Sequence, residues 1–588
     1  MKNIIFPIKG PSVILGPIIG LAAFFLCEPA LSQTLSAEQS YVDAISRSNN
    51  IRPLSTDAFG EKINLKDGDV RFEWTDIDIP GNSNIPIRLQ RVLKIEGTTM
   101  GGELGGFDLG GSFDVPYLGG VFPVTGWQVN GTLPNNRCSN PAPPPSATNH
   151  ISASDYWTGN SLHIPGESDE LMLAQPSNTI PEISDDQSYP WITKSFWRIS
   201  CLPQTKNGYP GEGFLAISPN GDKYYFDWVV TKHRYSYSKM YANYGTMDSA
   251  SLDAVRFLVS RIEDRFGNWA NYTYSNNLIS TITSNDGRFI KVTGISDGKI
   301  TSVSSSIGNY FYNYSNQNQT TITYPDGSSW RIASAGSREI TPSEFLPAYT
   351  STPRCPLPDL SVGNYQIFIH TPSGAEATYN FKVARHFRHN IPKICMAFTL
   401  QNKTFQTFQY LKFPNFSDSF TLTSKSVTIP GSSPAEFTYE YGIGASPLAF
   451  EEQCANTTTH GCPESMKTKI HESTGKVETY TFGAKFGVNE NQLLEHSEGM
   501  ENGTPPNTTE TIQRKTVYTY VKDSEIPNHP FPSLVGDEMI SFSDHVAAAG
   551  LRPLKTIEIV VDNKSHVKSV VSYDIFARPT QIEKSSSP

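Results

Sequence analysis

Short aromatic runs separated by tight-turn residues recur along the chain from about residue 213 onward. The runs Tyr272-Thr-Tyr274 and Tyr310-Phe-Tyr312 place a ring on every second residue, and Asp286-Gly287 is a typical hairpin-turn dipeptide. Successive side chains of a β-strand point to opposite faces, so the rings of each run share one face. A single hairpin cannot bury such a face. We therefore expect a mainly β protein in which antiparallel hairpins pack into a larger sheet.

The residues that mark these predicted hairpins fall in two clusters and at the end of the chain. They are Asp264, Gly267, Asn268, Tyr272 and Tyr274, then Asp286, Gly287 and Arg288, and finally Tyr573, Asp574 and Arg578. A second similarity lies between His370-Thr-Pro-Ser-Gly374 and His471-Glu-Ser-Thr-Gly475, each followed by a Tyr-x-Phe triplet. Because Gly, Tyr and Phe match along with His, this predicts two homologous hairpins better than two catalytic histidines.

Length and charge limit the class of protein. A chain of 588 residues is expected to form two to four units or one repeat array. Charged residues make up 18%, which is below the level typical of disordered chains. The net charge of −10 argues against a nucleic-acid partner, because phosphate binding needs a basic face.

The first residues are arranged like a secretory signal peptide over residues 1–32. Lys2 and Lys9 precede the apolar run from Val13 to Leu26, and Ala30-Leu31-Ser32 supplies small residues for cleavage. A lipoprotein signal at Cys27 is the alternative, but the bulky Leu26 before it is unfavourable. No later segment is apolar for long enough to span a bilayer. The sequence thus predicts a secreted, cell-surface or periplasmic protein with no stable membrane span.

Cysteine usage is consistent with export. Cys27 lies in the predicted signal, and six cysteines remain, which allow fifteen pairings. Because closing a short loop costs less entropy, we favour pairing each with its neighbour in sequence. The expected disulfides are Cys138–Cys201, Cys355–Cys395 and Cys454–Cys462.

The chain divides by pattern into a lead-in and three β regions. Residues 33–63 hold a short helix, because Ser36-Ala-Glu-Gln39 resembles a capping box. Residues 64–255 form an N-terminal β region, in which Pro80-Gly81-Asn82 turns between two strands and residues 139–155 form a Pro-rich loop. Residues 256–345 carry hairpin repeats, and residues 346–588 carry further hairpins.

No motif for catalysis is found. His386-Phe-Arg-His389 lacks the spacing of a zinc protease, and no Gly-x-Ser-x-Gly elbow occurs. The glycine-rich residues 101–120 lack a following Lys-Ser/Thr, so they indicate tight turns rather than a phosphate loop. We expect no catalytic residue, cofactor or metal. The rings that would stack on a sugar, if exposed, are Trp127, Trp157, Trp191 and Trp197.

The hairpin motifs resemble the Rhs/YD-repeat family. Tyr573-Asp574-Ile-Phe-Ala577-Arg578 is similar to the Tyr-Asp-x-x-Gly-Arg unit that names the repeats, with Ala577 in place of Gly. The segment from Asp264 to Arg288 is a second match, and the segment from Asp76 to Ile87 resembles N-terminal regions of exported proteobacterial members. In that family the repeats wind an antiparallel strip into a shell that encloses a toxic domain, and members serve in toxin delivery or attachment.

The resemblance implies a structural role with some departures from the family. The chain has too few regular repeats to close a shell, and no Asp-Pro cleavage motif or toxin domain is recognised. The expected function is an exported scaffold that encases, presents or anchors a toxin domain or a separately encoded downstream chain. The free C-terminal strand edge is the expected docking place. A carbohydrate-binding surface adhesin is the alternative, and a secreted hydrolase is a third class for which no residue is named.

Overall fold

The computed structural model of the chain describes most of residues 59–587, and the longest gaps within that range are 96–102, 175–186, 339–362, 447–461 and 526–552. Strands account for 62% of the chain and helix for 1%, so the predicted all-β class is confirmed. The predicted signal at residues 1–32 and the predicted helix from Ser36 lie outside the described residues. Within the described residues, no helix is long and apolar enough to cross a membrane.

A small antiparallel sheet begins the described chain. Its strands, in spatial order, are β1 (Glu61–Ile63), β2 (Val70–Asp78), β3 (Arg88–Ile95) and β4 (Ser112–Asp114). Alternate apolar residues of β2 are buried, and the predicted Pro80-Gly81-Asn82 turn lies between β2 and β3. Strand β1 occupies the end of the segment predicted as a helical lead-in, so the β region starts before residue 64. The reason is that Glu61 to Ile63 pair with Val70 to Phe72 across a short turn.

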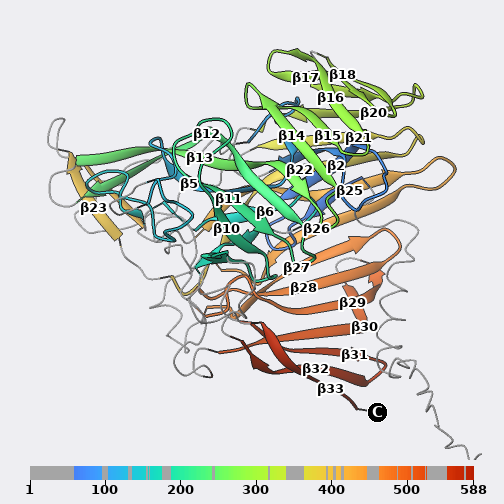
Figure 1. The fold of residues 1–588 in the computed structure, drawn as a ribbon. Coiled ribbons are helices and arrows are strands. Elements are labelled where there is room, and N and C mark those ends of the chain that lie inside the picture. The colour runs from blue at the N-terminus through green and yellow to red at the C-terminus, as the bar shows by residue number, and fades with distance from the viewer. Residues whose placement is uncertain are drawn as a thin grey trace, which may run out of the picture. The chain divides into compact units, whose positions relative to one another are not determined.

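A large antiparallel sheet of 27 strands contains most of the chain (Figure 1). Its first strands are short: β5 (Tyr117–Pro123), β6 (Ser161–His163), β7 (Glu170–Leu171), β8 (Leu173–Ala174), β9 (Trp191–Ile192), β10 (Arg198–Leu202) and β11 (Gly213–Ile217). Two long strands follow, β12 (Lys223–Tyr241) and β13 (Thr246–Glu263). From β8 to β22 each strand pairs with the next, so hairpins follow one another along the sheet.

Strand β13 is a branch point. Along one side it pairs with β12, while on the other side β5 pairs with Leu252 to Leu258 and β14 (Trp269–Ser275) pairs with Arg261 to Glu263. Strands β6 and β7 extend the β5 branch. The sheet is therefore joined at β13 to a segment that precedes it by more than a hundred residues.

The remaining strands continue the sheet to the C-terminal end. They are β15 (Leu278–Ser284), β16 (Phe289–Ser296), β17 (Lys299–Ser305), β18 (Gly308–Ser315), β19 (Gln319–Thr323), β20 (Ser329–Gly336), β21 (Asn364–His370), β22 (Glu376–Phe387), β25 (Phe416–Thr428), β26 (Ala435–Ile443), β27 (Ser465–Glu472), β28 (Lys476–Gly483), β29 (Leu493–Thr504), β30 (Asn507–Tyr520), β31 (Leu554–Val561), β32 (Lys564–Tyr573) and β33 (Pro579–Ser587). Strands β23 (Cys395–Leu400) and β24 (Gln406–Leu411) form a separate pair, so β22 pairs with β25. The sheet does not close into a barrel.

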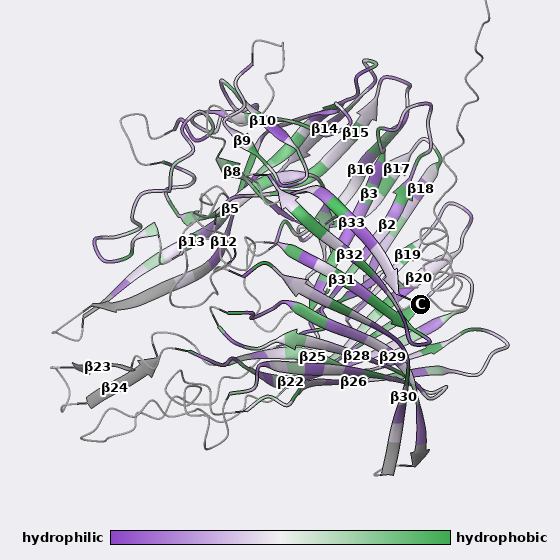
Figure 2. Cartoon of the chain, turned by 90° about the horizontal axis from the view of Figure 1, so that it is seen from below, coloured by the Kyte–Doolittle hydropathy of each residue, from purple (hydrophilic) through white to green (hydrophobic). Residues whose placement is uncertain are grey.

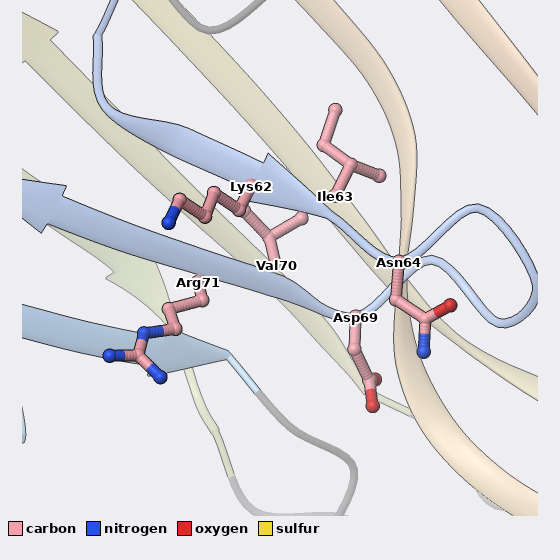
Figure 3. Close-up of a pocket in the computed structure, with 6 residues that line it drawn as sticks. All are labelled: Lys62, Ile63, Asn64, Asp69, Val70 and Arg71. Atoms are coloured by element: carbon pink, nitrogen blue, oxygen red, sulfur yellow. The ribbon is translucent and has the colours of Figure 1, made fainter. Parts of the chain in front are cut away.

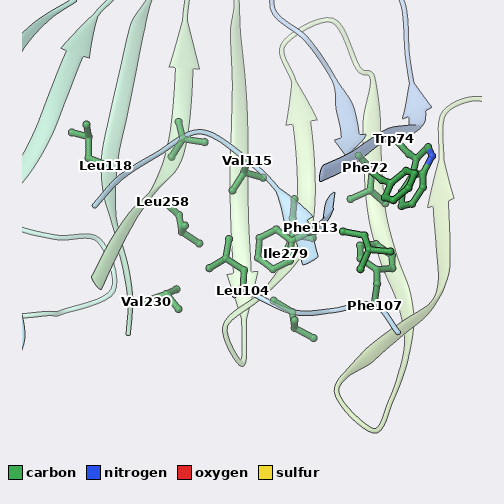
Figure 4. Packing of buried hydrophobic residues seen from close by; sticks show 14 of the residues in the cluster. Phe72, Trp74, Leu104, Phe107, Phe113, Val115, Leu118, Val230, Leu258 and Ile279 are labelled. Carbon is green, nitrogen blue, oxygen red and sulfur yellow. The ribbon is translucent and has the colours of Figure 1, made fainter. Parts of the chain in front are cut away.

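The small sheet packs on one face of the large sheet and forms the core with it. Figure 4 shows Phe113 of the N-terminal segment beside Ile279 of the large sheet, while Leu258 of the large sheet lies further along the same core, towards Leu118. Phe72 meets Tyr379 edge to face at 4.9 Å between ring centroids, and Phe107 lies 5.2 Å from Tyr312. Figure 2 shows the alternation of apolar and polar residues along the strands that makes this two-layer packing favourable.

The two hairpins predicted from the repeated histidine pattern are both present. His370 ends β21 and Gly374 lies in the turn to β22, while Gly475 turns between β27 and β28. Their buried faces differ, because Tyr379 is fully buried whereas Tyr480 is only half-buried and stacks on His496 at 4.2 Å. Rings on alternate residues thus mark the core face in β14, β18 and β22 but not in β28.

The disulfide Cys138–Cys201 is present as predicted, with its Cα atoms 5.5 Å apart. Cys462 is also disulfide-bonded, whereas Cys355 and Cys454 lie outside the described residues. Residues 139–153, the described part of the predicted Pro-rich loop, form no strand. The loop is held in place, since Ser139 donates to Glu212 at 2.7 Å and Tyr156 donates to the carbonyl of Pro145 at 2.7 Å.

Removing this disulfide should lower the free energy of unfolding. The disulfide closes a loop of 63 residues, and the double variant Cys138→Ser/Cys201→Ser opens this loop in the unfolded chain. The free energy of unfolding should fall by about 2–4 kcal/mol. Urea unfolding followed by tryptophan fluorescence measures the loss, because Trp191 donates to the Cys138 carbonyl at 2.8 Å. An unchanged midpoint would show that the bridge does not constrain the unfolded chain.

Candidate functional site

The predicted repeat-motif residues form one recurring five-residue turn. In Asp264–Asn268 the backbone N–H of Asp264 donates to the carbonyl of Asn268 at 2.9 Å, and the backbone N–H of Asn268 donates back to the Asp264 carboxylate at 2.9 Å. Gly267 has φ of +84°, a left-handed conformation that favours glycine. The same N–H to carbonyl bond closes the turns Ser284–Arg288 and Asp574–Arg578. The motif is therefore a hairpin-closing device, and its polar side chains serve the backbone.

Arg288 does more than close its turn. Its Nε donates to Asp286 at 2.8 Å, and its Nη1 donates to the carbonyl of Ile79 at 3.0 Å, in the turn between β2 and β3. A Cβ at Gly81 would lie only 2.1 Å from the Arg288 Cζ, so this turn needs glycine where the guanidinium crosses it. Hydrogen bonds from Arg288 and then Ser284 lower the pKa of Asp286 to about 2. Arg288 thus fastens the large sheet to the small one.

The turn Asp574–Arg578 contains an arginine–aspartate ion pair like that of Arg288 with Asp286. The Arg578 Nε donates to Asp574 at 2.6 Å, and the Arg578 guanidinium lies 3.4 Å from the ring centroid of Phe196. Tyr573 donates its hydroxyl to the carbonyl of Leu554 at 2.6 Å. Ala577, which stands where the family has Gly, lies outside the described residues. This last turn is tied to the segment around Phe196.

The predicted motif tyrosines are core residues. Tyr272 and Tyr274 are buried, and the Tyr274 hydroxyl donates to the carbonyl of Val259 at 2.7 Å. Burial raises the pKa of both phenols. A buried, neutral and hydrogen-bonded phenol stabilises the sheet interior, so these rings are not available to an external ligand.

The four tryptophans proposed as sugar platforms are also buried. Trp127, Trp157 and Trp191 are each 1% exposed and Trp197 is 6% exposed. Trp127 stacks on Phe122 at 4.8 Å and meets Phe257 edge to face. The adhesin hypothesis required these four tryptophans to be exposed, and their burial contradicts that requirement. The short strands β5 to β11 use these rings as their core.

Two buried ion pairs, one within the small sheet and one between the two sheets, contribute to the contact between the small sheet and the rest of the core. Arg91 of β3 holds Asp76 of β2 through two hydrogen bonds of 3.0 Å, and Asp76 also accepts a bond of 3.1 Å from the Tyr312 hydroxyl. Lys425 of β25 pairs with the fully buried Glu61 of β1. A buried charge without its partner is costly, so these pairs fix how the two sheets dock.

His163 was not predicted as special, yet it lies between two carboxylates. Its Nε2 is 2.7 Å from Asp114 and its Nδ1 is 2.6 Å from Asp169. Burial alone lowers the pKa of His163, but hydrogen bonds to Asp114 and Asp169 outweigh it and raise the pKa. His163 is on β6 and Asp114 is on β4, so the charged imidazole is another link between the sheets. Only Asp169 is near in sequence, and no motif marks the trio.

The predicted histidine pair His386 and His389 takes structural bonds. The His386 Nε2 lies 3.0 Å from the Thr421 hydroxyl, and the His389 Nε2 accepts from the Ser446 N–H at 3.0 Å. Burial lowers the pKa of His386 to about 4 and also lowers the pKa of His389. Across the described part of the chain, no group of three or more His, Cys, Asp or Glu side chains is arranged to hold a metal ion.

A pocket of about 310 Å³ lies at the β1–β2 hairpin (Figure 3). Its cations Lys62 and Arg71 are both held by Glu73, each with a nitrogen–oxygen distance of 2.7 Å. Arg71 also reaches Asp114 at 3.3 Å. Since the protein itself neutralises both charges, this pocket offers little to a charged ligand.

The free edge of β33 is the remaining candidate site. Strand β33 pairs with β32 on one side, and among the described residues no strand pairs with its other side. All nine residues of β33 are exposed, whereas β31 is half-buried throughout. An extended strand with one unpaired edge presents N–H and C=O groups that can accept another strand. A strand edge of the kind predicted for docking is therefore present at the C-terminal end of the described chain.

Arg288→Ala should destabilise the protein by about 2–3 kcal/mol, because it leaves buried carbonyls of the β2–β3 turn without a donor. Arg265→Ala is the control, since Arg265 is exposed in the equivalent turn and its loss should change stability by less than about 0.5 kcal/mol. Urea unfolding of both variants measures the difference. Equal effects would show that Arg288 does not fasten the sheets.

The raised pKa of His163 predicts a pH dependence with a defined sign. The charged imidazole stabilises the folded state fully below the unfolded pKa of about 6.5, and the stabilisation is lost as pH rises through the folded pKa. The free-energy difference between wild type and His163→Gln should therefore shrink as the pH rises above about 6.5. A difference that stays constant over this range, measured by urea unfolding, would contradict a charged His163.

Comparison with known proteins finds similarity to solved structures and to no family model or curated protein. No protein-family model matches the sequence, and no curated protein matches it. One solved structure found by comparison is the N-terminal domain of effector protein SpvB from Salmonella typhimurium strain LT2. It is 11% identical, with a TM-score of 0.17, and the match covers 62% of this chain and 94% of that one.

Proposed function

We propose that the chain is an exported, non-catalytic scaffold of the Rhs/YD kind that presents a partner polypeptide at the free edge of β33. The observation that carries this proposal is the exposed terminal strand of a continuous antiparallel sheet. Strand addition to such an edge supplies affinity through main-chain hydrogen bonds, and side chains supply specificity. The partner is a toxin domain or a separately encoded downstream chain.

The position of the small sheet favours presentation over enclosure. The aromatic face of the hairpins is already covered by the chain's own residues, through contacts such as Phe72 with Tyr379 and Phe107 with Tyr312. A toxin domain on that part of the face would have to displace these rings and the buried pair Glu61–Lys425. Docking at the edge requires no such displacement.

Export is supported by the disulfide chemistry as well as by the signal-like N-terminus. Disulfides such as Cys138–Cys201 persist in oxidising compartments and are rare in the reducing cytosol. We place the protein in the periplasm, at the cell surface or outside the cell. The adhesin alternative receives no support from the tryptophans, because all four candidates are core residues.

The test co-expresses a separately encoded downstream chain with residues 1–588. We expect a stoichiometric complex by size-exclusion chromatography. The backbone N–H groups of adjacent residues in an edge strand point in opposite directions, one toward the paired strand and one toward the free edge. Of the two variants Ile582→Pro and Glu583→Pro, one therefore removes an N–H that faces β32 and the other removes an N–H that faces the free edge. The variant that loses the N–H on the free edge should abolish the complex. If no complex forms, or if both variants leave the complex intact, edge docking is refuted.

A further inference from the structure

A lysine and a glutamate meet in the core where the small sheet packs on the large one. Glu61 lies on β1 and Lys425 on β25, 364 residues apart in the chain, and the Lys425 Nζ contacts the Glu61 Oε1. Their side chains are 0% and 2% exposed, respectively. In the other lysine–carboxylate pairs of the described residues, the lysine side chain is at least 19% exposed. This pair therefore differs from the others because both groups have lost their contact with water.

Aromatic rings surround the lysine. The Lys425 Nζ lies 5.8 Å from the ring centroid of Tyr379 and 5.3 Å from that of Phe437, and both rings are buried. Two opposite charges are costly to hold away from water, and transfer of one proton from the ammonium to the carboxylate would remove both. The products of that transfer are a neutral amine and a neutral carboxylic acid. A desolvated lysine amine is a nucleophile, so the core places a nucleophile beside a carboxyl carbon.

Two hydrogen-bond donors lie next to this carboxyl group. The Glu61 Oε2 accepts a hydrogen bond of 3.0 Å from the Phe59 N–H, which fixes the orientation of the carboxyl group. Burial and then the Glu61 carboxylate raise the pKa of Tyr379, so its phenol stays protonated next to Glu61. A fixed N–H and a protonated hydroxyl stabilise a carboxyl oxygen that gains negative charge during attack on its carbon. The surroundings of Glu61 therefore favour addition of an amine.

The Asp76–Arg91 pair offers a comparison in the same core. Both of its side chains are buried, and Asp76 also accepts a hydrogen bond of 3.1 Å from the Tyr312 hydroxyl. A guanidinium is delocalised and stays charged in proteins, so Arg91 does not become a nucleophile. Burial and a neighbouring phenol are thus common to both pairs, whereas the amine is present at Lys425 and absent from the Asp76–Arg91 pair.

We propose that Lys425 and Glu61 condense into an intramolecular amide that joins β25 to β1 covalently. The Lys425 ammonium gives one proton to the Glu61 carboxylate, and the amine nitrogen then attacks the carboxyl carbon. The nitrogen loses a second proton, and both protons leave with one carboxyl oxygen as water. One carbon–nitrogen bond forms and one carbon–oxygen bond breaks, so the reaction consumes no oxidant, reductant or further substrate.

The fold supplies the proximity that this reaction needs. Two groups held side by side react as if each were present at an effective concentration of about 10⁵–10⁸ M when their geometry is favourable. Exclusion of water from the core also protects the product from hydrolysis. The amide is independent of any partner at the β33 edge, and it would hold the small sheet on the large sheet even after the Cys138–Cys201 disulfide is reduced.

Intact-mass spectrometry of the full chain, denatured and with its disulfides reduced, tests for the amide. We expect a mass about 18 Da below that of the unlinked chain, which is the mass of one water. A tryptic digest should contain one branched peptide that joins Glu61 to Lys425. Lys425→Arg keeps the positive charge without the amine, so this variant should have its full mass.

A second pair of variants tests the part played by the phenol. Tyr379→Phe keeps the ring and removes the hydroxyl next to Glu61, so cross-linking, sampled at intervals after synthesis, should slow about tenfold or more. Tyr272→Phe is the matched control, because it removes a buried hydroxyl elsewhere in the same sheet and should leave the rate unchanged.

Wild-type protein of full mass would overturn the proposal, whatever the variants show, so the test does not depend on whether Lys425→Arg folds. A mass loss that the digest assigns to another position, such as a succinimide at Asp67, would also overturn it. The same holds for a mass loss that persists in Lys425→Arg. Equal rates in Tyr379→Phe and Tyr272→Phe would refute the part assigned to the Tyr379 hydroxyl.

Discussion

Burial of the aromatic face of the hairpins against the small N-terminal sheet is the contact on which the other features depend. An antiparallel sheet with alternating rings needs a cover for one face, and here the chain provides it from its own first strands. Phe72, Phe107 and Phe113 supply the apolar area, and each meets a tyrosine from a different part of the large sheet: Tyr379, Tyr312 and Tyr274. One small sheet therefore organises hairpins that are far apart in sequence.

Polar contacts give this docking its geometry. The Asp76–Arg91 pair with Tyr312, the Glu61–Lys425 pair, the Arg288 bonds to the β2–β3 turn and the charged His163 each join the two sheets at a different point. Buried ion pairs add little net stability compared with apolar packing, but each is costly to break. A shifted register would leave several of these charges unpaired, so the contacts select one arrangement.

The sequence allowed the hairpins to be predicted because their signals are local. Glycine at the fourth position of the Asp264–Asn268 turn and the alternation around Tyr272 depend on neighbours within a few residues. The disulfide between Cys138 and Cys201 followed from proximity along the chain. Contacts between distant segments could not be found in this way. Nothing near Arg288 indicates Ile79 as its acceptor. The identical patterns at Tyr379 and Tyr480 do not indicate that the first ring is fully buried and the second only half-buried.

The branch at β13 affects how the chain can fold. Tyr117 of β5 pairs with Leu258 of β13, so the ladder that anchors the N-terminal segment forms only after the whole intervening chain is available. Closing such a long loop costs conformational entropy before the native contacts that offset this loss have formed, and this slows folding. Sheets dominated by pairings between distant segments fold slowly for this reason. During that delay β5 remains unpaired with β13. For a chain exported as we propose, slow closure of this ladder would keep the N-terminal segment open during transit, and the final register would form only after release.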